Sequence, residues 1–102
     1  MGRKVEIKLT GASLEQNFIR INNYPEEHLN RISPNSWGYV FYNIDLNNNG
    51  LEYLEFDFRS EGAAGDTPAL TIIIDGKTPH YTYNTRPYNN EGKLWINQRI
   101  NL

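Results

Sequence analysis

Apolar and polar residues alternate along most of this chain, as they do in β-strands that bury one face. Near the start, Val5, Ile7 and Leu9 alternate with charged residues, which predicts a half-buried strand. The same character recurs along the chain and indicates about seven strands. The segments concerned are residues 4–9, 18–21, 37–46, 51–59, 69–75, 80–84 and 93–101.

The turn chemistry between these segments predicts how some of them connect. Residues 47–50 read Asn-Asn-Asn-Gly, and Asn and Gly tolerate the positive φ angles of tight turns. We therefore expect 37–46 and 51–59 to form a hairpin. Residues 69–75 are apolar enough for an interior strand, which the Asp75-Gly76 turn would end.

Only one stretch has helical character. Pro25 is followed by two acidic residues, a pattern typical of a first helical turn. This predicts one short helix near residues 25–30. The fold class we expect is all-β: an antiparallel, jelly-roll-like β-sandwich that forms a single domain over residues 1–102.

Composition excludes several classes of function. The net charge is −2 without a long basic run, so a nucleic-acid partner is not expected. The chain has no cysteine, and no apolar stretch approaches the roughly 20 residues that cross a bilayer. No signal segment is evident at the start. We expect a soluble protein without a membrane partner, either cytoplasmic or part of a larger exported protein.

The residues of hydrolytic sites are scarce in this chain. The histidines are His28 and His80, and no Gly-x-Ser-x-Gly motif is present. The acidic pair Glu55 and Asp57 falls on the outward side of a predicted strand, where solvated carboxylates are ordinary. We expect no enzyme activity and no cofactor.

Residues 45–50 have the ligand pattern of the first half of a calcium-binding loop. Residues 45–50 place oxygen ligands at the first, third and fifth positions and Gly at the sixth, as in the first half of a calcium loop. In these six residues the chain resembles an EF-hand or dockerin loop. Phe56 stands where the bidentate acid belongs. An Asn-rich turn is the favoured interpretation, with a weak calcium site at Asp45 as the alternative.

The last strand carries the strongest candidate for a binding surface. Leu94, Ile96 and Ile100 share one parity, which places Trp95, Asn97 and Arg99 on the other, outward side. An indole can stack on a sugar ring while an amide and a guanidinium bond its hydroxyls. We add four further candidate ligand-binding residues from elsewhere in the chain, namely Tyr83, Arg86, Tyr88 and Trp37. The alternative is that Trp95 is covered by the chain itself or by a second copy.

Residues 36–77 resemble part of a carbohydrate-binding module of the galactose-binding-like jelly-roll type. The resemblance lies in the order WGYVFYNIDL (37–46), a Gly turn, LEFDFR (54–59), a small-residue loop and LTIIIDGK (70–77). It implies a jelly-roll sandwich and a carbohydrate ligand. No residue matches a ligand position of the family, so Trp37, Tyr88 and Trp95 are candidates on physical grounds alone.

Two functions follow as hypotheses. The first is a non-catalytic module that binds a glycan through an exposed aromatic and polar sheet face. The alternative is a small stand-alone interaction or structural protein, of a kind that viruses and phages encode, whose exposed aromatics contact a protein partner. In that case a homodimer through strand 69–75 or strand 93–101 is one expected assembly.

Overall fold

The computed structural model describes residues 2–46, 52–77, 81–84 and 86–102, with the backbone alone for 81–84. Eight strands form in these residues, all seven predicted ones and a further short one, β3. They are β1 (Arg3–Thr10), β2 (Ser13–Ile21), β3 (Asn30–Ser33), β4 (Ser36–Ile44), β5 (Tyr53–Glu61), β6 (Ala69–Ile74), β7 (Tyr81–Asn84) and β8 (Lys93–Asn101).

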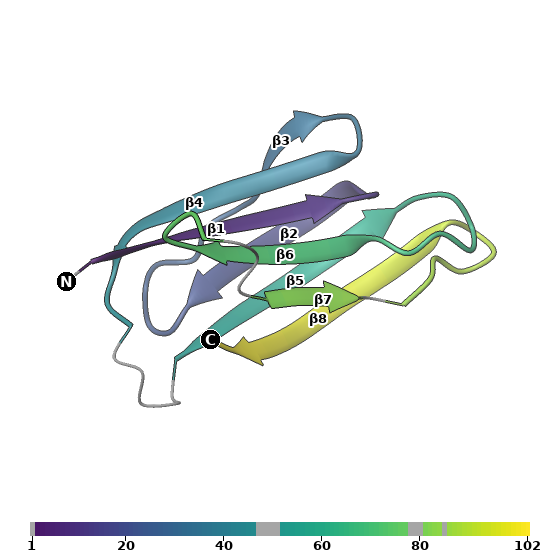
Figure 1. Cartoon of the computed structure of the whole chain (residues 1–102). Helices are drawn as coiled ribbons and strands as arrows, with labels where there is room; N and C mark the ends of the chain where they lie inside the picture. Colours follow the sequence, from purple (N-terminus) through teal and green to yellow (C-terminus); the bar gives the residue numbers. More distant parts are fainter. Residues whose placement is uncertain (1, 47–51, 78–80, 85) are drawn as a thin grey trace.

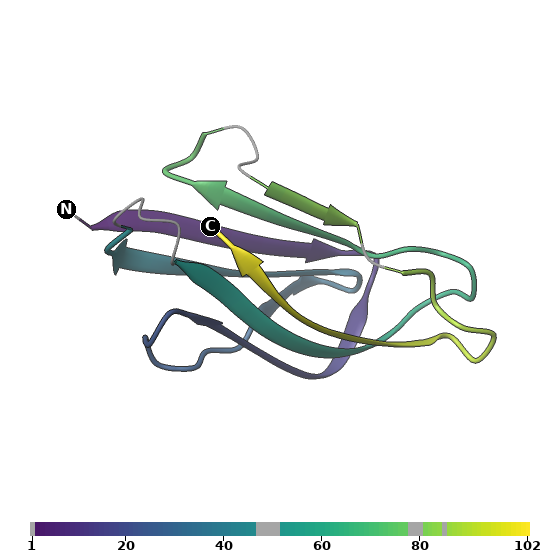
Figure 2. The ribbon, with the colours of Figure 1, turned by 90° about the horizontal axis from the view of Figure 1, so that it is seen from below.

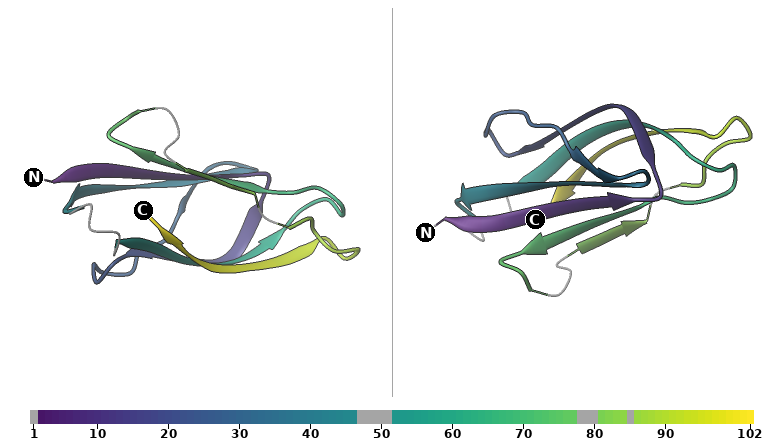
Figure 3. Two further views of the ribbon diagram at one scale, coloured as in Figure 1. Left: turned by 60° about the horizontal axis from the view of Figure 1, so that its bottom comes forward. Right: turned by 90° about the horizontal axis from the view of Figure 1, so that it is seen from above.

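The strands form two antiparallel sheets that pack face to face as a β-sandwich (Figures 1 and 2). The larger sheet has the strand order β3-β4-β1-β6-β7, and the smaller has the order β2-β5-β8. Figure 3 shows the two layers from two further sides. The expected all-β sandwich is therefore confirmed, and β6 is an interior strand between β1 and β7, as predicted.

The core lies between the two sheets. From the larger sheet, Val5, Ile7 and Leu9 are fully buried, and from the smaller sheet Leu54, Phe56 and Phe58 are fully buried. The rings of Phe56 and Phe58 stack with centroids 5.1 Å apart. Each such side chain contributes about 1.5–3 kcal/mol by leaving water. The alternation in the sequence thus identified the buried face of β1 and of β5.

The predicted hairpin between residues 37–46 and 51–59 is wrong. β4 pairs with β1 and β3, whereas β5 pairs with β2 and β8 in the other sheet. Both edges of each strand are therefore occupied by other neighbours. β4 and β5 contribute buried side chains to the same core from opposite sheets. The turn itself, residues 47–51, lies outside the described residues.

The predicted helix near residues 25–30 is also wrong, because this segment continues the smaller sheet. Glu27 forms a bridge with Ile19 on β2, with both backbone N–O distances at 2.8 Å. The Leu29 N–H then donates to Asn17 Oδ1 at 2.6 Å. A helix of one or two turns has few hydrogen bonds to offset its nucleation cost. Pairing of this segment with the edge of β2 is therefore more favourable. No helix that could span a membrane occurs in the described part of the chain.

Candidate functional site

The smaller sheet has one face in the core and one face toward solvent, and the solvent face collects side chains from β2, β5 and β8. We call this surface the outer face. Pairing between the strands arranges its side chains in rows that cross the sheet. The middle rows are Gln16–Arg59–Trp95 and Phe18–Asp57–Asn97, and the next row is Arg20–Glu55–Arg99.

Trp95 is the most exposed aromatic side chain described on the outer face, with 52% of its surface accessible. Its indole N–H donates to Asp57 Oδ1 at 2.6 Å. The guanidinium carbon of Arg59 lies 4.8 Å from the centre of the indole ring, a cation–π distance. Two contacts from β5 therefore hold an exposed aromatic plane in one orientation, and the predicted outward direction of Trp95 is confirmed.

A charged row borders the middle rows on one side. Glu55 accepts a hydrogen bond from Arg99 at 3.0 Å and another from Arg20 at 2.7 Å. These two bonds hold the pKa of Glu55 below its ordinary value, and the bond from Arg99 makes the larger contribution. The Arg99 guanidinium also lies 4.3 Å from the ring centre of Tyr53. Glu55 is thus an ionised residue that orients two arginines.

A second charged cluster borders the middle rows on the opposite side. The Lys93 ammonium contacts Glu15 at 2.8 Å and also contacts Glu61, which lies across the β5–β8 ladder from it. Hydrogen bonds to Glu15 and then Glu61 raise the pKa of Lys93. Between the two charged rows, the middle rows form a less charged strip that runs across the strands.

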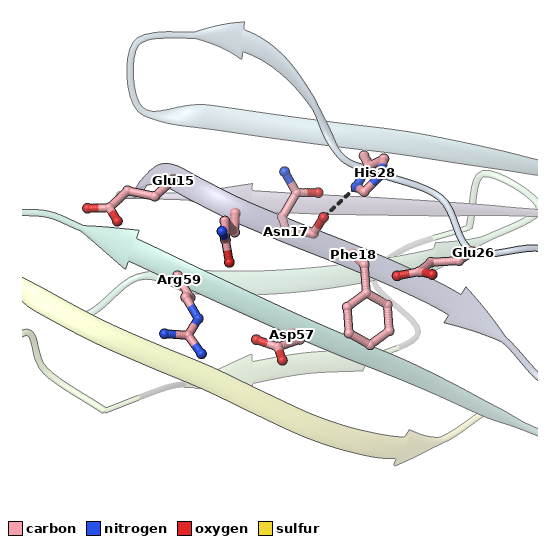
Figure 4. A pocket seen from close by; sticks show the side chains of 8 residues that line it. Glu15, Asn17, Phe18, Glu26, His28, Asp57 and Arg59 are labelled. Carbon is pink, nitrogen blue, oxygen red and sulfur yellow. Dashed lines mark hydrogen bonds between the residues drawn. The ribbon is translucent and has the colours of Figure 1, made fainter.

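The outer face is hollowed at its β2 side. A depression of about 510 Å³ is lined by Phe18, Asp57 and Arg59 on one side and by Glu26 and His28 on the other (Figure 4). His28 Nδ1 donates to the backbone oxygen of Asn17, which fixes the imidazole at this margin. A second depression of about 290 Å³ shares Arg59 and reaches Trp95. The two hollows adjoin across β5.

Four of the predicted ligand-binding residues lie together. Trp95, Asn97 and Arg99 are exposed on β8. Arg86 is exposed next to them, and its Nη2 donates to the backbone oxygen of Trp95 at 3.3 Å. A hollow of about 410 Å³ is lined by Arg86, Pro87 and Trp95, among others. Their role as ligand contacts stays a prediction.

The other candidates lie elsewhere. Tyr88 is only 3% exposed, and its hydroxyl donates to the Gly11 backbone oxygen at 2.8 Å. Burial raises the pKa of this phenol, and its position makes it a structural tie. Trp37 is half-buried on β4 of the larger sheet, with its N–H bonded to the Ala12 oxygen at 3.0 Å. Tyr83 is on β7 of the larger sheet, and its side chain lies outside the described part. We therefore remove Tyr88 and Trp37 from the candidate surface.

The candidate calcium site falls mostly outside the described residues. Asp45 is exposed, and its backbone N–H donates to the Tyr24 hydroxyl at 3.1 Å. The other candidate ligands of that loop belong to residues 47–51. Within the described ranges, no group of three or more His, Cys, Asp or Glu side chains is placed to hold a metal ion.

Sequence reasoning missed the β2 half of the outer face. Phe18 and Gln16 join Trp95 only through β5, and His28 joins because its segment pairs with β2. The alternation in β5 did place Asp57 outward, and Arg59 lies on the same side. Their contact with Trp95, however, depends on the register between β5 and β8, for which the sequence carries no local signal.

Comparisons with known proteins give no relative for this chain. No family model matches it, and searches of the curated proteins and of the solved structures found no match. The chemistry of the outer face is therefore the basis for the functional inference.

Proposed function

We propose that this protein is a non-catalytic binding module whose outer face binds a carbohydrate. The observation that carries the proposal is the orientation of Trp95, which is exposed yet held by Asp57 and Arg59. A large exposed aromatic side chain leaves apolar surface in water, and it is a common anchor for a ligand. The orientation of the Trp95 ring is fixed before a ligand arrives. Binding therefore costs little additional entropy of the Trp95 side chain.

The groups around Trp95 fit a polyhydroxylated ligand. Asn97 offers an amide donor and acceptor, Arg99 offers planar donors, and Gln16 offers a second amide across β5. These groups surround an aromatic plane, so one ring of a sugar can stack while its hydroxyls form hydrogen bonds. The hollow beside Phe18 extends the surface across β5 and gives room for more than one linked ring.

The state of the acids favours binding over acid–base catalysis. Glu55 has a lowered pKa and two arginine partners, so it carries no proton to donate near neutral pH. Asp57 is occupied by the indole N–H of Trp95. Both acids therefore serve in the proposal to position other side chains. The likeness of residues 36–77 to a jelly-roll carbohydrate module supports the same ligand class, and a jelly-roll topology is part of the proposal.

Glycan-array binding of the folded protein tests this proposal. We expect a signal on a restricted set of glycans and its loss in Trp95→Ala. The matched control is Tyr42→Ala, because Tyr42 is a large aromatic residue that is 68% exposed on β4 of the other sheet. It should leave the signal unchanged. A folded wild-type protein that binds no glycan refutes the proposal.

A second candidate function, binding of a protein partner, is favoured by the opposite surface. Ile32 on β3 and Tyr42 on β4 are 65% and 68% exposed on the larger sheet. Aromatic and large apolar side chains at the surface can serve as anchors for a protein partner. If the glycan array shows no binding, this alternative would be supported by a protein ligand that binds the wild type and Trp95→Ala but does not bind Tyr42→Ala.

A further inference from the structure

One edge of β8 carries backbone groups that have no hydrogen-bond partner among the described residues. β8 is nine residues long and forms one edge of the smaller sheet (Figures 1 and 2). Backbone groups of successive strand residues point to opposite sides. The Leu102 N–H donates to the Glu52 oxygen at 2.9 Å, in continuation of the β5–β8 register. The backbone N–H and C=O groups of the even-numbered residues of β8 therefore face β5. Odd-numbered groups therefore face away from β5.

The first odd-numbered positions already have partners within the chain. The Lys93 N–H donates to Asn89 Oδ1 at 2.9 Å, and the Lys93 oxygen accepts from the Asn89 N–H at 3.1 Å. The Trp95 oxygen accepts from Arg86. From Asn97 on, no described residue hydrogen-bonds to the outward backbone groups of Asn97 or Arg99. An exposed strand edge of this kind is a template for another strand.

We propose that a second copy of this chain pairs with β8 in antiparallel orientation, about a two-fold axis at Gln98. Asn97 of one copy would then lie opposite Arg99 of the other, and each such pair exchanges two backbone hydrogen bonds. These are the outward groups that lack a described partner. The two Asn97–Arg99 pairs beside the axis do not use the Trp95 oxygen, so the hydrogen bond from Arg86 to that oxygen can remain.

The side chains of β8 are complementary to themselves in this register. On the inner side, Ile96 lies opposite Ile100 of the second copy, and half-buried Leu94 lies opposite half-buried Leu102. The exposed amide of Gln98 meets its own copy on the axis. On the outer side, the Asn97 amide meets the Arg99 guanidinium, so no like charges are opposed.

Neighbouring registers are worse for the same side chains. An axis at Arg99 would place two guanidinium groups directly opposite each other, which is destabilising. An axis at Asn97 would place Ile96 opposite the polar Gln98 and require the Trp95 oxygen that Arg86 already occupies. The axis at Gln98 joins the two smaller sheets into one sheet of six strands, three from each copy. The proposal rests on the backbone edge of β8 and not on a ligand of the outer face, although Asn97 and Arg99 belong to both surfaces.

The residue on the axis gives the test. Sedimentation velocity over a wide range of protein concentrations should show a monomer–dimer equilibrium for the wild type. Gln98→Lys opposes two ammonium groups on the axis, and Gln98→Glu opposes two carboxylates. Each should weaken dimerisation by about tenfold or more. An equimolar mixture of the two variants opposes a cation to an anion and should restore the dimer.

Two controls accompany the measurement. Asn30→Lys adds the same charge to β3, an edge strand of the other sheet, and should leave the dimer unchanged. The thermal unfolding of the Gln98 variants should match the wild type at equal monomer content, since the Gln98 side chain is exposed. A wild type that stays monomeric at every concentration overturns the proposal. So does a Gln98→Lys dimer of wild-type affinity, or a mixture that remains monomeric.

Discussion

The two tryptophans stand in opposite sheets and show how the surroundings decide the use of one residue type. Both indole N–H groups have an oxygen acceptor, and both rings have an arginine nearby. Trp37 donates to the backbone of Ala12, a buried residue in the connection between β1 and β2. Trp95 donates to the carboxylate of Asp57 on the solvent side of β5.

This difference separates a structural tryptophan from one that is available to a ligand. Trp37 packs against the core and ties β4 to the β1–β2 connection, so its bond stabilises the fold. The bond of Trp95 fixes the orientation of an exposed ring and connects no buried elements. Four substitutions, taken from the largest expected effect to the smallest, test this contrast.

Trp37→Ala should lower the free energy of unfolding by about 2–3 kcal/mol. The variant removes a half-buried ring from the edge of the core and leaves the buried Ala12 oxygen without its donor. Urea denaturation followed by far-UV circular dichroism measures the change. Tyr42→Ala, an exposed aromatic on the same strand, should cost no more than about 0.5 kcal/mol. Equal losses in the two variants would remove the structural role of Trp37.

Trp95→Ala should act on binding instead of folding. We expect the affinity for an array-identified glycan to fall by about tenfold to a hundredfold, as expected for an aromatic anchor. The free energy of unfolding should change by at most about 1 kcal/mol, because the ring is largely exposed. Isothermal titration calorimetry and urea denaturation give the two values. A stability loss as large as that of Trp37→Ala would contradict the contrast.

Asp57→Ala should weaken glycan binding by about threefold to tenfold, since it removes the acceptor that orients the Trp95 ring. Asp57→Asn keeps an oxygen acceptor at this place and should retain most of the affinity. Fluorescence anisotropy of Trp95, measured with Trp37→Phe as background, should fall in the Ala variant alone. If anisotropy is unchanged in Asp57→Ala, Asp57 does not position the indole.

Glu55→Gln should have the smallest effect, at most about 0.5 kcal/mol, and this effect should depend on pH. The pKa of Glu55 is lowered in the folded protein, so its ionised form stabilises the fold above the unfolded value of about 4.5. That contribution is lost as the pH falls below this value toward the folded pKa. The stability difference between wild type and variant, measured at several pH values, should therefore be constant near neutrality and shrink in acid. A difference that grows in acid would contradict the assignment.

Features that depend on neighbouring residues could be predicted from the sequence. Alternation placed Val5, Ile7 and Leu9 inward and Trp95 outward, because a strand turns successive side chains to opposite faces whatever its partners are. The Asp75-Gly76 turn could also be predicted, and both residues have the positive φ that this turn requires. The helix at 25–30 failed because hydrogen bonds to β2 outweigh a weak local preference.

By itself, then, the sequence determined where seven of the eight described strands run and which side of β1, β5 and β8 is apolar, since period-two alternation is a local property. Only the tertiary structure decided which strands are neighbours. It separated β4 from β5, buried Tyr88, placed Trp37 in the opposite sheet from Trp95, and brought Asp57 and Phe18 onto the same face as Trp95. Strand pairing joins residues far apart in the chain, and its free energy comes from the shared core, so no short segment encodes it.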